Sequence, residues 1–283
     1  MAVNLSNKII DEAYKNLYGS FYKVDCKNKK ILRLLNYFLE YRVRTYIYFI
    51  NILRSFLRKI PRYNIGQKTY HIKKSCLSSN GGIVKKEILD KGYVFLENFL
   101  DNDFHYYLNK NFPKKFELQK SKSAFKNYNI GYIYLKNEKH LTLEKNSAIN
   151  ILYRFILSPE FENEINNIFN LDSKKLFCKN IVTSIAETKS FLIPHMDSIS
   201  LERKDLNINF IYFVDGNDNE IEYSGGTSIY EDNEAKKILL KPTTLKNSLL
   251  IYDNTKNFFH GFKIMKKNCF RKAVTFQFNL SSN

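Results

Sequence analysis

The sequence predicts an α+β protein with a mainly β core, in which about eight strands form a two-sheet jelly roll or barrel. Short apolar segments separated by turn residues follow one another from about residue 176 to the C-terminus. Apolar residues at helical spacing dominate the chain before that point. Aromatic residues make up 15% of the chain, and Tyr, Phe and Ile favour strands. The length of 283 residues suits one large domain or a domain with an appendage.

Residues 1–80 form a basic, helical N-terminal extension in this interpretation. Between residues 29 and 62 there are nine basic residues and one acid, and Pro61 ends the helical pattern. Such a helix either packs on the core with its basic face in water or lies on an anionic membrane. The apolar positions at helical spacing are Ile31, Leu35, Phe38, Tyr46, Phe49, Ile50, Leu53, Leu57 and Ile60.

The segment 63–82 contains Gly66, Gly81 and Gly82 and reads as a linker, so the domain boundary is placed near residue 80. The second domain, 81–283, opens with a strand pattern over 92–100. Asp101 is a plausible N-cap for the helix that follows that strand.

Residues 147–169 predict two helices, and the second of them starts at Pro159. The chain then changes to strands and turns. The expected strands are 176–187, 190–197, 206–215, 225–232, 236–242, 247–253, 258–264 and 271–279.

The net charge of +17 is compatible with nucleic acid, an anionic membrane surface or an acidic substrate, or with a biased genome composition. The four cysteines form no C-x-x-C pair, so free thiols in a reducing compartment are expected. No signal-peptide pattern opens the chain, and no run approaches the roughly 18–20 apolar residues of a spanning helix. These features predict a cytoplasmic protein, with peripheral membrane contact through residues 29–62 as the further possibility.

The most informative motif is His195-Met196-Asp197, followed by His260 and Arg271. Two imidazoles and one carboxylate are the ligands of a facial iron triad that leaves positions open for oxygen chemistry. On a strand, the i and i+2 positions of His195 and Asp197 share one face. Arg271 is placed to bind the carboxylate of an organic co-substrate, because guanidinium binds carboxylate in a two-pronged geometry.

From about Gly92 onward, roughly two-thirds of the chain, the sequence resembles the Fe(II)- and 2-oxoglutarate-dependent dioxygenase superfamily. Within that superfamily it is similar to the prolyl-hydroxylase-like bacterial branch. The segments that carry the resemblance are SFLIPHMDS, NINFIYFVDG, EYSGGTSIYED, NSLLIYDNTKNFFHGF and RKAVTFQF.

The resemblance implies a double-stranded β-helix, of the jelly-roll or cupin-like kind, with supporting helices. It assigns Fe(II) binding to His195, Asp197 and His260, which are also the catalytic centre. Arg271 would pair with the distal carboxylate of 2-oxoglutarate, and Asn209 would help to hold this co-substrate. The implied reaction consumes O2, with ascorbate as an optional further cofactor, and hydroxylates a C–H bond with release of succinate and CO2.

Three differences from relatives narrow the function, and a fourth concerns the co-substrate contacts. Prolyl hydroxylases usually carry Lys where this chain has Arg271, and nucleic-acid demethylases carry R-x-N-x-T-x-R on the last strand, which is absent here. Asp197 argues against halogenases, which replace the carboxylate with a small residue. Ala186 stands where relatives often place a Tyr that binds the co-substrate.

We therefore expect a hydroxylase acting on a sugar, glycolipid or other small or anionic metabolite, and we expect no nucleic-acid partner. The alternatives are a peptidyl, prolyl-type hydroxylase and a non-catalytic metal-binding protein on a cupin-like fold.

Overall fold

The computed structural model describes residues 45, 48, 49, 52, 72, 75–120, 127–134, 147–169, 176–196 and 206–280. Most of the predicted N-terminal extension, 1–80, lies outside the described residues, but Thr45, Tyr48, Phe49 and Ile52 are helical. In the described part, no helix is long and apolar enough to cross a membrane.

The helices are α3 (Leu77–Asp90), α4 (Asn102–Lys110), η2 (Lys115–Glu117), α5 (Ala148–Ile156), α6 (Pro159–Phe169) and η4 (Ile221–Tyr223). The strands are β1 (Tyr93–Glu97), β2 (Gln119–Lys120), β3 (Asn127–Tyr134), β4 (Leu176–His195), β5 (Asn207–Gly216), β6 (Ser228–Tyr230), β7 (Ile238–Leu240), β8 (Ser248–Asp253), β9 (Phe259–Phe262) and β10 (Phe270–Leu280).

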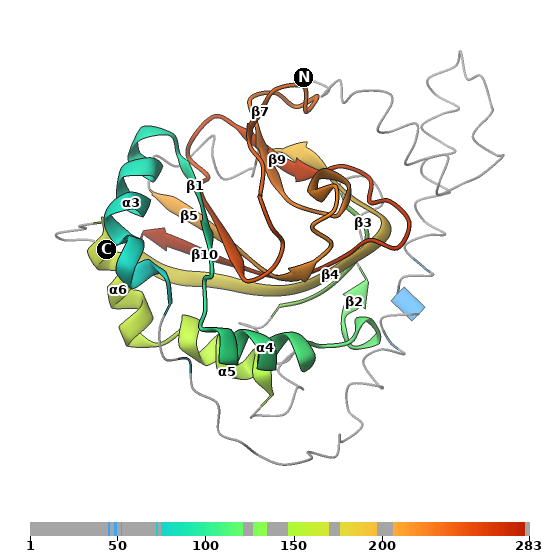
Figure 1. Cartoon of the computed structure of the whole chain (residues 1–283), viewed down its shortest axis with the longest axis horizontal. Helices are drawn as coiled ribbons and strands as arrows, with labels where there is room; N and C mark the ends of the chain where they lie inside the picture. The colour runs from blue at the N-terminus through green and yellow to red at the C-terminus, as the bar shows by residue number, and fades with distance from the viewer. Residues whose placement is uncertain are drawn as a thin grey trace.

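The strands form one antiparallel sheet that folds over on itself into a nearly closed, barrel-like sandwich (Figure 1). The strand order is β1-β8-β5-β10-β4-β9-β6-β7, and β3 pairs with β4. The first part of β4 pairs with β10, whereas its end pairs with β9, so β4 belongs to both layers. The prediction of a mainly β, jelly-roll-like core is confirmed.

The sequence predicted two strands over 176–197, but the structure has a single strand there, β4. The corner lies near Lys189, whose φ is 68°. The Lys189 amide donates to the Met265 carbonyl, and the Glu187 amide donates to the Ser190 hydroxyl. These bonds satisfy the backbone at the bend, so the strand turns the corner without ending.

The two faces of β10 serve different purposes. Val274, Phe276 and Phe278 belong to the core that the sheet shares with helices α3, α4, α5 and α6. Ala273 points to the opposite face and packs with apolar residues between the two layers. Because Arg271 is separated from Ala273 by one residue of the strand, it points into that same interior.

The interpretation of 63–82 as a linker is wrong for its last residues, because α3 begins at Leu77 and includes Gly81 and Gly82. Leu77, Val84 and Ile88 are buried along one face of α3, and this burial stabilises the helix despite its glycines. The boundary placed near residue 80 thus falls inside a helix.

The predictions for the other helix starts are confirmed. The Asp101 carboxylate accepts a hydrogen bond from the Phe104 amide at 3.0 Å and caps α4. Helix α6 begins at Pro159, as its N1 preference predicts.

Replacing Phe276 with Ala is expected to destabilise the fold by about 3–5 kcal/mol, because a large buried aromatic would leave a cavity. Phe276 stacks on Phe210 with ring centroids 4.8 Å apart and also contacts Phe161 of α6. Phe177→Ala is the matched control, since this side chain is 39% exposed. Urea unfolding measures both variants, and equal losses of stability would contradict the proposed core.

Candidate functional site

His195 and His260 lie beside each other where the two layers join. His195 is the last residue of β4, His260 is near the start of β9, and the two are paired in the strand register. Their ring centroids are 4.4 Å apart, with 49° between the ring planes. Two of the three predicted iron ligands are therefore adjacent in the structure, although they are far apart in the sequence.

A backbone contact orients the His195 ring. Its Nδ1 lies 2.8 Å from the Ile193 carbonyl oxygen. If Nδ1 carries the proton and donates this bond, Nε2 keeps its lone pair for a metal, as is usual for metal-binding histidines.

Asp197 lies outside the described residues, so its place on the same face as His195 stays a prediction. No group of three His, Cys, Asp or Glu that could hold a metal ion occurs within the described ranges. Those ranges contain only two of the three ligands that the sequence predicts.

Gly261 allows β9 to approach β4 closely. A Cβ at this position would lie 2.5 Å from the Leu192 carbonyl oxygen and 2.8 Å from the Pro194 nitrogen. Both are backbone atoms that cannot move without disturbing β4. Only glycine fits, and the close approach holds the neighbouring His260 against His195.

The His260 ring is buried against Tyr252, a residue that the sequence analysis did not single out. The two ring centroids are 4.9 Å apart. The Asn209 Nδ2 donates a 3.0 Å hydrogen bond to the Tyr252 hydroxyl. Asn209, which the resemblance assigns to the co-substrate, thus contacts the side chain that supports His260. No local pattern singles out Tyr252, because all six residues of β8 are buried.

A row of amide side chains continues from Tyr252 across the sheet. Asn209 pairs in register with both Tyr252 and Gln277, and Gln277 pairs with Asn180. The Asn180 Nδ2 donates to Gln277 Oε1 at 3.3 Å, and Gln277 Nε2 donates to Asn207 Oδ1 at 2.8 Å. The interior of the fold is therefore polar beside the histidine pair.

Arg271 is a buried cation. Its Nη1 donates to the Gly225 carbonyl at 2.9 Å and to the Thr227 hydroxyl at 3.1 Å. The guanidinium carbon lies 4.6 Å from the centre of the Phe262 ring. Burial lowers the pKa of Arg271 from 12.5 to about 10, because the charged form is removed from water.

The Arg271 guanidinium has no carboxylate partner among the described residues, and its buried Nε has no hydrogen-bond acceptor there. Ala186 pairs with Arg271 in the strand register and offers only a methyl group. Gly225, which supplies one acceptor, has a φ of 88°, a backbone conformation that favours glycine. An unpaired buried cation is costly and favours an anionic ligand.

Comparison with known proteins supports the fold. No protein-family model and no curated protein sequence match this chain. A solved structure of a prolyl-4-hydroxylase from Pseudomonas putida aligns with TM-score 0.51 and 11% identity, covering 73% of this chain and 100% of that one.

A prolyl hydroxylase from Trichoplax adhaerens, in complex with a hypoxia inducible factor oxygen degradation domain peptide fragment, aligns with TM-score 0.51 and 14% identity. That alignment covers 72% of this chain and 90% of the hydroxylase. The architecture is thus similar to that of prolyl hydroxylases.

If His195 and His260 bind a metal, as the sequence predicts, Gly261→Ala is expected to weaken that binding by about 10–100-fold, the range seen when groups that orient metal ligands are lost. The added methyl would push β9 away from β4 and separate the two histidines. Titration with Co(II), followed by its visible absorption, measures the affinity. Gly82→Ala is the control, since a Cβ there meets nothing within 4 Å. Unchanged affinity in a folded Gly261→Ala protein would contradict this role.

Asn209→Ala distinguishes two roles for this amide. If Asn209 acts through Tyr252 on His260, the variant and Tyr252→Ala should both bind Co(II) several-fold more weakly, and Tyr252→Phe should lie between them and the parent. If Asn209 instead contacts a co-substrate, Co(II) affinity should stay unchanged while 2-oxoglutarate affinity falls. Isothermal titration with each ligand separates these outcomes.

Proposed function

We propose that the protein is an Fe(II)- and 2-oxoglutarate-dependent dioxygenase that hydroxylates a C–H bond of a sugar, glycolipid or other small or anionic metabolite. The observation that carries the proposal is Arg271, a buried cation that points into the same interior as the histidine pair. A dicarboxylate would neutralise this charge at one end and reach a metal at the other.

The residues present fit an iron centre. His195 and His260 are adjacent, and the His195 ring is oriented through Nδ1, which suits coordination through Nε2. Asp197 would supply the carboxylate of the facial triad. When bound, Fe(II) and 2-oxoglutarate supply the chemistry that couples decarboxylation of the co-substrate to oxidation of a C–H bond by O2, with ascorbate as an optional further cofactor.

The other residues of the site bind and orient. Gly225 and Thr227 hold the Arg271 guanidinium through Nη1, and Phe262 covers its face. These contacts fix the cation before a ligand arrives, so little reorganisation is needed on binding. Tyr252 packs against the His260 ring, and Asn209 donates a hydrogen bond to the Tyr252 hydroxyl.

The row of amides supports a hydroxyl-rich substrate, because amide groups both donate to and accept from hydroxyls. The row leads away from Tyr252, which contacts His260.

A peptidyl, prolyl-type hydroxylase is the second candidate, and the similarity to two prolyl hydroxylases favours it. Arg271 in place of the usual Lys weighs toward the metabolite substrate.

Anaerobic addition of Fe(II) and 2-oxoglutarate should produce a weak visible metal-to-ligand charge-transfer band. In Arg271→Met the affinity for 2-oxoglutarate should fall by about 100-fold or more, because removing one partner of a buried charge pair costs roughly 3–5 kcal/mol. Lys272→Met is the matched control, since Lys272 lies next along β10 and instead contacts Asn109 and Asp215.

Two outcomes would contradict the proposal. A band of equal strength in Arg271→Met would remove Arg271 from co-substrate binding. Iron binding without any band in the parent would favour the non-catalytic metal-binding alternative.

Succinate release stimulated by glycans but not by proline-containing peptides, or the reverse, would then separate the two substrate classes.

A further inference from the structure

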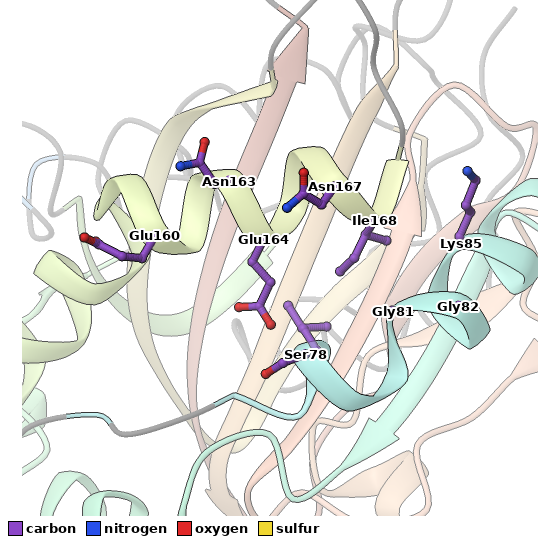
Figure 2. A pocket seen from close by; sticks show the side chains of 10 residues that line it. Ser78, Gly81, Gly82, Lys85, Glu160, Asn163, Glu164, Asn167 and Ile168 are labelled. Atoms are coloured by element: carbon purple, nitrogen blue, oxygen red, sulfur yellow. The ribbon is translucent and has the colours of Figure 1, made fainter.

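Charged side chains gather at two places outside the contacts described so far. One is a groove of about 610 Å³ between α3 and α6, which Figure 2 shows side by side. All of its lining residues belong to these two helices. The Ser75 hydroxyl, just before α3, donates a hydrogen bond to the Glu164 carboxylate of α6 at 3.3 Å. This contact joins the two helices, so the carboxylate has a structural role in their packing.

The second place is the loop that holds Arg271. The η4 loop, residues 217–227, supplies two hydrogen-bond acceptors of the Arg271 guanidinium, the Gly225 carbonyl and the Thr227 hydroxyl. Its regular part, η4, is only three residues long, so the position of the loop depends on contacts with other segments. Any displacement of the loop would move two of the contacts that orient the cation.

Two ion pairs join the η4 loop to the β9–β10 connection. Glu222 of the loop pairs with Lys263 of the connection, and Glu220 pairs with Lys266. The Lys263 and Glu222 side chains are 29% and 18% exposed, whereas those of Lys266 and Glu220 are 52% and 59% exposed. A pair that is partly shielded from water is less screened by salt and holds its partners more strongly. The Glu222–Lys263 pair is therefore the stronger link.

The β9–β10 connection is itself fixed to the corner of β4. The Met265 amide donates to the Ser190 carbonyl at 2.8 Å, and the Met265 carbonyl accepts from the Lys189 amide at 2.9 Å. From the other side, the Lys266 amide donates to the Tyr223 carbonyl of the η4 loop at 3.0 Å. The connection thus forms a support, anchored on β4, to which the loop is attached.

We propose that Glu222 and Lys263 are positioning residues of the Arg271 site, because their ion pair holds the η4 loop where it orients the guanidinium. Glu222 lies three residues before Gly225, which accepts a hydrogen bond from the cation. Lys263 directly follows Phe262, whose ring covers the guanidinium. The ion pair therefore joins the two segments that hold Arg271. The identity of the ligand rests on the proposed function, whereas the placement of Arg271 does not.

Glu222→Gln and Lys263→Met should each weaken 2-oxoglutarate binding several-fold, because each removes one charge of the pair and frees the loop. Isothermal titration with Co(II) present measures this affinity. The double variant should lose no more than either single variant, since all three remove the same interaction. Lys263→Arg keeps the charge and should bind like the parent. Co(II) affinity should be unchanged throughout, because the loop orients Arg271 and not the histidines.

The exposed ion pair on the same two segments provides the matched control. Glu220→Gln and Lys266→Met make the same chemical changes in a pair that water screens more strongly. Both variants should therefore bind 2-oxoglutarate as the parent does.

An NMR measurement without any ligand tests the positioning role separately. The nitrogen-15 signal of the Arg271 Nε–H group, assigned by its loss in Arg271→Met, reports the order of the guanidinium. In Glu222→Gln its proton should exchange with water faster than in the parent, whereas in Glu220→Gln it should not.

Three results would overturn the proposal. The first is an unchanged 2-oxoglutarate affinity in both Glu222→Gln and Lys263→Met. The second is an equal loss in the Glu220 and Lys266 controls. The third is a parallel loss of Co(II) affinity, which would indicate general damage to the fold. If the parent binds no 2-oxoglutarate but the Arg271 signal still responds to Glu222→Gln alone, the positioning role stands and the proposed function fails.

Discussion

The close pairing of β4 with β9 is the contact on which the candidate site depends. Leu192 pairs with Phe262 and His195 pairs with His260, and the absence of a side chain at Gly261 lets the two backbones approach. Because β4 also pairs with β10 in the other layer, this one strand closes the sandwich and carries a predicted metal ligand at its end. Closure of the fold and assembly of the histidine pair are thus the same structural event.

A second constraint is the burial of the Arg271 charge. The protein holds this guanidinium with a carbonyl, a hydroxyl and an aromatic face, none of which carries a negative charge. Neutral partners orient a cation but do not neutralise it. Within the described residues the fold therefore leaves this charge unbalanced, which an ordinary packed core does not do.

Much of this arrangement could be predicted from the sequence because strand patterns are local. Alternating apolar residues located the strands that carry His195, His260 and Arg271, and Asp101 and Pro159 located helix starts. The continuity of β4 could not be predicted, since it depends on a hydrogen bond from Lys189 to the distant Met265.

The role of Tyr252 and the helical state of Gly81 were also missed, for a related reason. Tyr252 matters because it contacts His260 across the fold, and the α3 glycines are accommodated because Ile168 of α6 packs beside Gly81. Each case depends on a partner that is remote in sequence. Local pattern identifies the element, but only the tertiary contact identifies what the element does.

The shared strand β4 has a consequence for ligand size. Ala186 lies opposite Arg271, and His195 lies opposite His260, on one continuous strand whose corner is held by backbone hydrogen bonds. This backbone sets the separation between the Arg271 Cα and the histidine pair, and the hydrogen bonds to Gly225 and Thr227 fix the guanidinium at the end of its side chain. Under the proposed assignment, this fixed geometry would favour a dicarboxylate of one length over another that differs by a single methylene group.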